Sequence, residues 1–482
     1  MASKFATADK ARIATSLQLL RDLGGQAMTE DKITFSGHRI TLPEGTSIPD
    51  NIRILQQVHA EQQQMTTFKE TFLYRPWDGA YTGYKAMKEA FGMISHHGTF
   101  FQAPELVTIP VDVDETERVP WGLFSIPFLP GVEFSFGSVM HEEFGEVFQV
   151  AASGPQMLAS EVNGVFKLIG EALKTDSLYR GKALDGRDQP NFIDVFSVDP
   201  RTVVYSEEVL RQLSANVWSY IKYADAYAAA GIPTKRSVVL YGPYGTGKTL
   251  AGLLTGQVAR RHGYTFLMAR PGRDDFMKVL QTARLYQPAV VYFEDVDTIA
   301  NPQGLDGDGL SMLLDAFDGI TSKNTRIIGV FTTNHPERVH AGMWRPGRID
   351  KAIKIGYLDT VGVEKLIRAT VPETMIAGDV DFQAISDSMP EFTPSFITGV
   401  AKGAFDYALD AAEGHTEGIL LTTQDFLDSA RSYRDQLELQ QGAPVDAQHD
   451  SLSDSLHRVV VSAAKQAAKS AIYDEVHPDV LI

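Results

Sequence analysis

The sequence of 482 residues contains no cysteine. Disulfide bonds, thiolate ligands to metals and cysteine nucleophiles are therefore excluded. It also has no run that approaches the roughly eighteen apolar residues of a membrane-spanning helix, and runs such as Ala289–Phe293 have only the length of a strand. The segment Met1–Gly25 mixes charges with apolar residues and lacks the continuous apolar stretch of a signal peptide. We therefore expect a cytoplasmic protein without membrane insertion.

Basic residues are scarce relative to acidic ones. Lysine and arginine together number 44, against 61 aspartate and glutamate residues, and the formal net charge is −17. An acidic chain is a poor general binder of nucleic-acid phosphates, although a small basic patch can lie on an acidic protein. The composition therefore argues against nucleic acid as the partner.

The pattern of helices and strands divides the chain into four regions. We expect a mixed α+β domain at 1–198, an α/β core with a parallel sheet at 199–358, an all-helical region at 359–438, and a linker with a C-terminal helix at 439–482. In the first region we expect strands at Lys32–Phe35, His38–Leu42, Leu106–Val113, Gly122–Ile126, Val132–Phe136 and Val147–Ala151, and helices at Thr82–Met93 and Ala159–Leu178. The strands expected in the core are Ser237–Tyr241, Tyr264–Ala269, Ala289–Phe293, Arg326–Thr332 and Lys351–Ile355.

The most specific motif follows the strand Ser237–Tyr241. It reads G-P-Y-G-T-G-K-T, the pattern between a strand and a helix that binds the phosphates of ATP or GTP. Glycines let backbone N–H groups curl around the phosphates, and the helix N-terminus adds a partial positive charge. Lys248 is expected to reach the β- and γ-phosphates, and the hydroxyl of Thr249 to bind Mg²⁺. The residues that we assign to the nucleotide are Gly242, Pro243, Tyr244, Gly245, Thr246, Gly247, Lys248, Thr249 and Leu250.

Two carboxylates follow the apolar strand Ala289–Phe293. At the carboxyl end of a parallel strand, such side chains point into the crevice where ligands bind. The usual order is an aspartate for Mg²⁺ and then a glutamate that activates the attacking water, but here Glu294 precedes Asp295. Moving the frame by one residue would put Val296 in the water-activating place, so we assign Glu294 to Mg²⁺ and Asp295 to the water. The shorter Asp295 side chain leaves the rate of hydrolysis open.

Polar residues also follow the next strand. Thr333 and Asn334 come after Arg326–Thr332, where the Asn334 amide could hold the attacking water against the γ-phosphate. Arg345 and Arg348 lie three residues apart in R-P-G-R-I-D. Two guanidinium groups on such a constrained turn are suited to bidentate contact with phosphate.

In their order and spacing these motifs resemble the AAA clade of the AAA+ ATPases. The matching stretches are VVLYGPYGTGKT (238–249), VVYFEDVD (290–297), LLDAFDGI (313–320) and TTNHPERVHAGMWRPGRID (332–350). The order of Glu294 and Asp295, and the segment Tyr223–Arg236, are similar to the subgroup that contains the mitochondrial inner-membrane AAA translocase of folded Rieske protein. That translocase carries a membrane anchor, which we do not expect here, so the same substrate is not inferred.

The resemblance implies a role for several residues. Asn334 would be sensor 1, and Arg345 and Arg348 would be arginine fingers that complete the ATP site of a neighbouring subunit. A finger that acts on a neighbour implies a homo-oligomeric ring, usually a hexamer in this family. The helices of 359–438 would form the lid that follows the ATPase core, and the cofactors would be ATP and Mg²⁺.

The link after the strand Tyr264–Ala269 departs from many protein-threading members of the family, which carry an aromatic–hydrophobic–glycine trio there. It contains Arg270 and Arg273, and Asp274 or Asp275 has the position of a helix N-cap. The link is either a basic loop that faces an acidic partner or an ordinary turn, and we favour the turn.

Three functions remain open at this point. The first is an ATP-hydrolysing, chaperone-like ring that remodels, translocates or assembles a protein target, with 1–198 as the recognition domain. The second is a nucleic-acid-coupled ATPase such as a loader or initiator, against which the acidity argues. The third is a scaffold that binds ATP and hydrolyses it weakly.

Overall fold

The computed structural model describes residues 63–92, 94–96, 106–298, 309–319, 325–339, 344–345, 347–415 and 418–442, the backbone of two strands between 32 and 41, and isolated positions between 53 and 61. The chain divides into two compact units, Met1–Gly356 and Tyr357–Ile482. Residues 439–442 of the expected linker belong to the helix Thr423–Gly442, and the rest of the linker and the helix expected at Leu456–Tyr473 lie outside the described residues.

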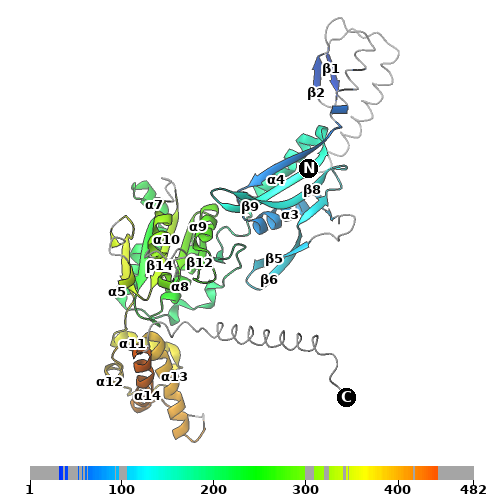
Figure 1. Ribbon diagram of the computed structural model, residues 1–482. Coiled ribbons are helices and arrows are strands. Elements are labelled where there is room, and N and C mark those ends of the chain that lie inside the picture. The colour runs from blue at the N-terminus through cyan, green and yellow to red at the C-terminus, as the bar shows by residue number, and fades with distance from the viewer. Residues whose placement is uncertain are drawn as a thin grey trace, which may run out of the picture. The chain divides into compact units, whose positions relative to one another are not determined.

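The N-terminal part of the first unit is built on an antiparallel sheet with the strand order β3-β9-β8-β7-β4 (Figure 1). Its strands are β3 (Met65–Phe72), β4 (Ser95–His96), β7 (Gly122–Ser125), β8 (Glu133–His141) and β9 (Gly145–Pro155). The helices α3 (Pro76–Phe91) and α4 (Ala159–Thr175) pack against each other and against this sheet. Gly79 allows a close approach of α3, because a Cβ there would lie 2.0 Å from the ring of Phe148 in β9. This confirms the expected mixed α+β character of the region.

Two hairpins accompany the sheet. β1 (Lys32–Phe35) pairs with β2 (His38–Thr41), as expected, and β5 (Leu106–Asp112) pairs with β6 (Glu115–Pro120). The expected strands and both expected helices are present, with boundaries that differ by a few residues. β3, β4 and β6 were not predicted.

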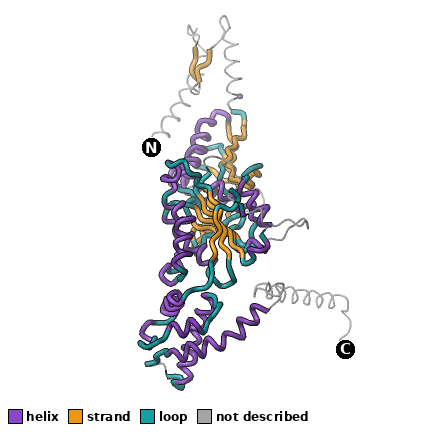
Figure 2. The backbone as a smooth tube through the Cα atoms, turned by 90° about the vertical axis from the view of Figure 1, so that its left-hand side faces the viewer, coloured by secondary structure: helices purple, strands orange, loops and turns teal. Residues whose placement is uncertain are grey.

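A parallel sheet forms the core of the region that was expected to be α/β, with the order β10-β12-β13-β14-β11-β15. Its strands are β10 (Ala183–Asp185), β11 (Arg236–Tyr241), β12 (Thr265–Ala269), β13 (Ala289–Phe293), β14 (Ile327–Thr333) and β15 (Lys351–Lys354). Figure 2 shows these strands flanked by helices. The five expected strands are all present, and β10 adds an edge strand from the segment before residue 199. The α/β fold expected for a P-loop protein is therefore confirmed.

Helices cover both faces of the parallel sheet. Val238 and Leu240 of β11 face one hydrophobic core, and Val239 between them faces the other. The first core is completed by α5 (Glu207–Leu213), the π-helix Ser214–Trp218, α6 (Ser219–Lys222) and α8 (Lys248–Arg261). The second is completed by α9 (Phe276–Leu285) and α10 (Gly309–Asp318), and the short α7 (Ala224–Ala229) follows α6. The alternation explains why these strands are continuously apolar.

Arg75 joins the antiparallel sheet region to the ATPase core. Its buried guanidinium donates to Thr282 Oγ1 (2.7 Å) and to the carbonyl oxygen of Lys278 (3.1 Å), both in α9. It also donates to the carbonyl oxygens of Phe144 (3.2 Å) and Glu146 (2.9 Å) near the β8–β9 turn. One buried cation therefore satisfies backbone groups from both regions.

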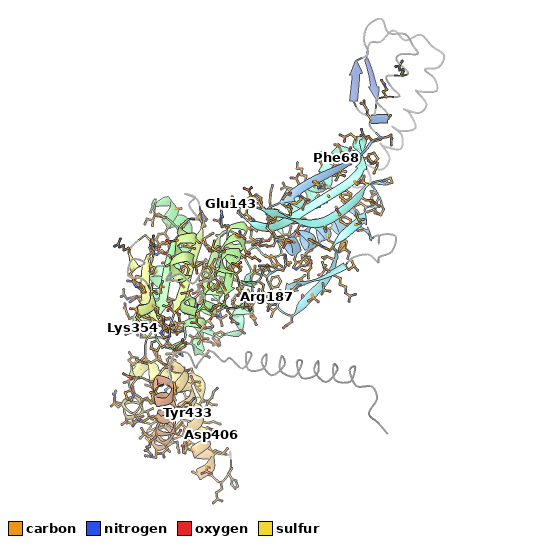
Figure 3. The ribbon with its side chains drawn as sticks, viewed as in Figure 1. Phe68, Glu143, Arg187, Lys354, Asp406 and Tyr433 are labelled. Carbon is orange, nitrogen blue, oxygen red and sulfur yellow. The ribbon has the colours of Figure 1, made fainter. Side chains whose placement is uncertain are left out.

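The same turn makes a second contact with α9. Glu143 (labelled in Figure 3) forms an ion pair with Arg284, whose guanidinium carbon also lies 5.0 Å from the centre of the Phe144 ring. Because α9 connects the link after β12 to β13, these contacts attach the antiparallel sheet region to the segment that leads into the ATP site.

The second unit is helical, with α11 (Thr360–Thr370), α12 (Phe382–Asp387), α13 (Pro394–Ala411) and α14 (Thr423–Gly442). Asp359 and Asp381 cap the first two helices through backbone N–H groups. Gly399 lets α13 approach α14, because a Cβ there would lie 2.9 Å from the ring of Tyr433 (Figure 3). No helix of the described residues is both long and apolar enough to cross a membrane.

Candidate nucleotide site

The phosphate loop connects β11 to α8. Gly242, Gly245 and Gly247 have φ angles of 153°, 75° and 94°, which residues with a side chain rarely adopt. At Gly242 a Cβ would also lie 1.9 Å from the carbonyl oxygen of Ile355. α8 begins at Lys248, so the partial positive charge of its N-terminus lies at the loop. The loop therefore has the backbone features of an anion-binding site.

Lys248 folds back onto this loop. Its Nζ donates to the carbonyl oxygens of Gly242 (2.7 Å) and Pro243 (2.8 Å). Burial lowers the pKa of Lys248 to about 8, and the nearby carboxylates of Asp295 and Asp297 oppose the shift. The ammonium group is thus held inside the loop in a charge state that is sensitive to pH near 8.

Two buried tyrosines hold the start of α8 in place. The Tyr205 hydroxyl donates to the carbonyl oxygen of Gly247 at 2.6 Å. The Tyr292 hydroxyl, from β13, donates to the carbonyl oxygen of Lys248. Neither tyrosine has a signal in the sequence that marks it as part of the site, because both reach the loop from elements distant in the chain.

The other predicted loop residues differ in exposure. Thr246 is buried, and its hydroxyl donates to the carbonyl oxygen of Pro243 at 2.8 Å. Tyr244, Thr249 and Leu250 are exposed. Thr249, in the first turn of α8, is therefore accessible to solvent.

The tips of β13 and β14 are joined by hydrogen bonds. Asp295 has a φ of 41°, and its backbone N–H donates to Thr332 Oγ1 at 2.9 Å. The Asn334 amide donates to Asp295 Oδ1 (2.9 Å), and the Asn334 backbone N–H donates to Asp297 Oδ1 (3.2 Å). The structure thus brings the predicted Asp295 and Asn334 into contact. The sequence analysis assigned no role to Asp297, although it ends the same motif.

Asp295 has the properties of a proton acceptor. Burial raises its pKa, as do the neighbouring carboxylates of Asp297 and Glu294, while Lys248 and the hydrogen bond from Asn334 lower it. A carboxylate with a raised pKa is a stronger base than an ordinary one.

Glu294 makes a contact that the sequence did not predict. Its Oε2 accepts a hydrogen bond from Arg270 Nε at 2.8 Å. Asp297 Oδ2 and Asn334 Oδ1 are buried and have no hydrogen-bond partner among the described residues. Within the same residues no three acidic or histidine side chains form a metal site by themselves. Oxygen atoms with unused lone pairs suit Mg²⁺, which proteins commonly bind through one or two side chains together with substrate phosphates, so the site fits a metal that arrives with the nucleotide.

The turn that contains Arg345 and Arg348 lies elsewhere. The hydroxyl of Ser237, at the amino end of β11, donates a hydrogen bond to the carbonyl oxygen of Arg348. The guanidinium of Arg348 pairs with Asp315 (3.1 Å). The phosphate loop follows Tyr241, at the carboxyl end of the same strand, which is roughly 13 Å further along at about 3.3 Å per residue. Arg345 is exposed. The structure therefore places Arg348 away from the phosphate loop of its own chain, whereas the ring of Trp344, next to Arg345, lies 6.3 Å from the ring of Tyr241.

Residues 238–357 match the family model of the ATPase family associated with various cellular activities (AAA). The chain therefore contains an AAA domain, as the motifs predicted.

Three known proteins are similar to part of the chain. The ATP-dependent zinc metalloprotease FtsH of Helicobacter felis is 27% identical over 195 residues, which are 37% of this chain and 31% of that protein. Protein SAV of Sulfolobus acidocaldarius is 24% identical over 229 residues (44% and 29%). The peroxisomal ATPase PEX6 of Candida glabrata is 27% identical over 188 residues (35% and 18%). The chain therefore spans less than a third of the length of each of these relatives. The resemblance to the Rieske-protein translocase subgroup stays a prediction.

Proposed function

We propose that this chain is a cytoplasmic subunit of a homo-oligomeric ring, a hexamer by analogy with the family, that hydrolyses ATP to remodel, translocate or assemble protein targets. The antiparallel sheet region would recognise the target, and the helical second unit would serve as the lid of the ATP site. The reaction is ATP + H₂O → ADP + phosphate.

The residues of one chain divide the work as follows. Lys248 exchanges its two loop carbonyls for the β- and γ-phosphate oxygens, and Asp295 accepts the proton of the attacking water while Asn334 orients it. Thr249 and Glu294 would hold Mg²⁺, which would neutralise charge on the phosphate oxygens. Glu294 can do so through Oε1, because Oε2 is engaged by Arg270.

The observation that carries the ring is the position of the arginine turn. Arg348 lies at the amino end of β11, the phosphate loop lies at its carboxyl end, and Arg345 is exposed. Arginines so placed are suited to reach a phosphate of an adjacent subunit rather than one of their own. An exposed Arg345 can form charged hydrogen bonds with a phosphate if it completes the ATP site of the neighbouring subunit.

A mixing experiment tests this arrangement. Arg345→Ala and Asp295→Asn should each bind ATP, and Arg345→Ala alone should lose roughly 10³-fold or more in turnover, as for other arginine fingers. Rings formed by exchange between the two inactive variants should regain activity, because an intact Asp295 then meets an intact Arg345 across one interface. Each variant exchanged with itself is the control. No recovery in rings shown to be mixed would contradict a finger that acts on the neighbour.

Two other functions predict different results in the same preparation. A nucleic-acid-coupled ATPase would be stimulated by single-stranded DNA, which the net charge of −17 disfavours. A scaffold would show negligible turnover in an assembled ring. The contact between Asp295 and Asn334 (2.9 Å) favours hydrolysis over the scaffold, because it holds the base beside a group that can orient water.

A further inference from the structure

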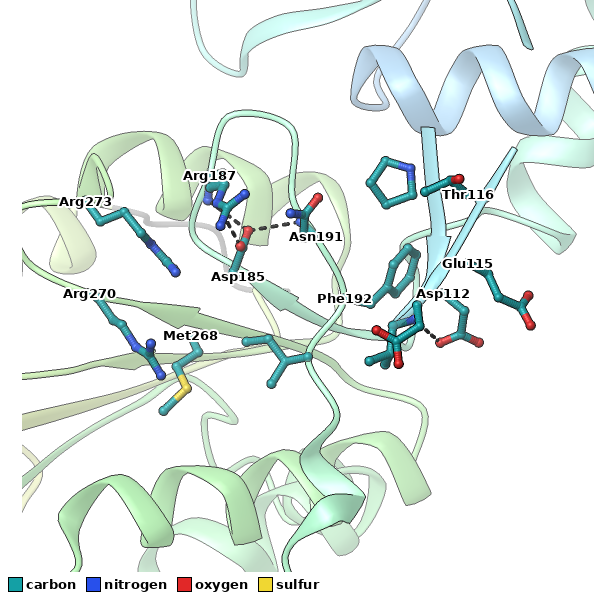
Figure 4. Close-up of a pocket in the computed structure, with 14 residues that line it drawn as sticks. Asp112, Glu115, Thr116, Asp185, Arg187, Asn191, Phe192, Met268, Arg270 and Arg273 are labelled. Atoms are coloured by element: carbon teal, nitrogen blue, oxygen red, sulfur yellow. Dashed lines mark hydrogen bonds and ion pairs between the residues drawn. The ribbon is translucent and has the colours of Figure 1, made fainter. Parts of the chain in front are cut away.

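A polar pocket outside the nucleotide site has a volume of about 540 Å³, in the usual range for ligand pockets. It lies between the β5–β6 hairpin and the loops that follow β10 and β12. Figure 4 shows three arginines on one side of it and carboxylates of the hairpin on the other. Of these residues, only Arg270 has a part in the proposed ATP hydrolysis, because it donates a hydrogen bond to Glu294.

The three arginines, which we call the basic wall of the pocket, each form an ion pair with a carboxylate. The pairs are Arg187–Asp185 (3.0 Å), Arg270–Glu294 (2.8 Å) and Arg273–Asp274 (2.8 Å). The carboxylate side chains are at most 11% exposed, whereas the arginine side chains are 36–52% exposed. A guanidinium that is oriented in this way loses little side-chain entropy when it binds a further anion with its remaining N–H groups.

The two loops that carry these arginines are packed tightly together. A Cβ at Gly186, after β10, would lie 2.7 Å from the Asp274 carboxylate, after β12. The same carboxylate accepts a hydrogen bond from the Arg270 backbone N–H at 2.8 Å. The basic wall is therefore a preformed surface.

The opposite wall carries the other sign of charge. Asp112, Asp114 and Glu115 at the tip of the hairpin are all exposed and line the pocket. Between the two walls lie apolar side chains that include Phe192 and Met268. A ligand that fits has an anionic end, an apolar middle and a cationic end.

We propose that this pocket binds a polypeptide segment in which an acidic and a basic side chain lie a few residues apart. The acidic side chain is bound by the arginines, the basic one by the hairpin carboxylates, and the chain between them packs on Phe192 and Ile193. Nucleic acids and polyphosphates fit poorly, because the hairpin carboxylates repel them. The segment would belong to the protein target, so the inference rests on the proposed function in that respect.

Binding of a labelled peptide to the full chain, without nucleotide, tests the proposal. The probe is a fluorescein-labelled peptide with the core Lys-Ala-Ala-Glu, and its counterparts carry Lys-Ala-Ala-Lys or Glu-Ala-Ala-Glu. Fluorescence anisotropy should show the mixed-charge peptide binding most tightly. The double change Arg187→Gln and Arg273→Gln should weaken it roughly tenfold or more, since charged hydrogen bonds are lost. Arg270 is left intact because it also holds Glu294.

A charge reversal in the hairpin gives the sharper result. Asp114→Lys with Glu115→Lys should shift the preference to the Glu-Ala-Ala-Glu peptide. Arg201→Gln is the matched control for the double arginine variant. Arg201 also pairs with a nearby aspartate (2.7 Å), but it does not line the pocket. All variants should keep the ATP affinity of the parent chain. Circular dichroism checks that the double arginine variant is folded, because it leaves the buried carboxylates of Asp185 and Asp274 without their ion-pair partners.

Several results would overturn the proposal. One is unchanged peptide affinity in the double arginine variant, and another is no binding of any peptide up to about 1 mM. A third is that tripolyphosphate or a DNA oligonucleotide binds more tightly than the mixed-charge peptide, and that the double arginine variant loses this binding. The peptide-binding assay contains no nucleotide, so its result does not depend on the outcome of the mixing experiment. The proposed peptide pocket and the proposed ATP-hydrolysing ring can therefore fail separately.

Discussion

The lowered pKa of Lys248 predicts that ATP affinity depends on pH just above neutrality. In the free protein this pKa is about 8. Bound phosphates favour the charged ammonium and raise the pKa again. Binding therefore takes up a proton when the pH is above about 8, and affinity is fully present below that pH and lost as the pH rises through it.

The size of the effect follows from the fraction of protonated lysine. A group with a pKa of about 8 is roughly nine-tenths protonated at pH 7 and roughly one-tenth protonated at pH 9. The apparent dissociation constant for ATP should thus rise about tenfold between pH 7 and pH 9, which corresponds to about 1.4 kcal/mol. A lysine with an ordinary pKa near 10.4 would give almost no change over this range.

Isothermal titration calorimetry in buffers of different ionisation enthalpy measures both the affinity and the proton uptake. Lys248→Arg is the matched control, because its guanidinium stays charged throughout this range. That variant reports any contribution from titration of the nucleotide itself. An affinity that is flat between pH 7 and pH 9, or that falls equally in Lys248→Arg, would refute the reasoning.

Three further predictions concern single substitutions. Asp295→Asn should retain ATP binding and lose on the order of 10²–10⁴-fold in turnover, measured by phosphate release. Glu294→Gln should instead weaken Mg²⁺-dependent binding of ATP, measured by an affinity assay. The opposite pattern in these two assays would exchange the roles of the two residues. Arg75→Met should lower the free energy of unfolding by about 3 kcal/mol or more, because buried carbonyl groups lose a charged donor, and a loss below about 1 kcal/mol in urea titrations would contradict this. Gly242→Ala should abolish ATP binding, because its Cβ would meet the Ile355 carbonyl at 1.9 Å; near-normal affinity by thermal shift would show that the loop can move aside.

The sequence by itself predicted the features that depend on local chemistry. The strand at Ala289–Phe293 was predicted with its observed bounds, because five consecutive apolar residues bounded by polar ones suit a strand buried on both faces. The glycines of the phosphate loop were recognisable because their backbone conformations exclude side chains. The edge strands β3 and β10 escaped prediction. β10 has three residues, and β3 (MTTFKETF) alternates poorly, so both owe their strand conformation to pairing with β12 and β9.

Only the tertiary structure decided which distant side chains meet. The contact of Arg270 with Glu294 depends on β12 and β13 being neighbours, and no spacing along the chain specifies it. The approach of the acidic hairpin to Arg187 depends in the same way on the packing of separate elements. The sequence indicated that Arg345 and Arg348 form a motif, but the place of Arg348 at the amino end of β11 follows from the parallel pairing of β11 with β15. Local patterns encode conformation within a few residues, whereas the partners of a side chain are set by the packing of the whole sheet.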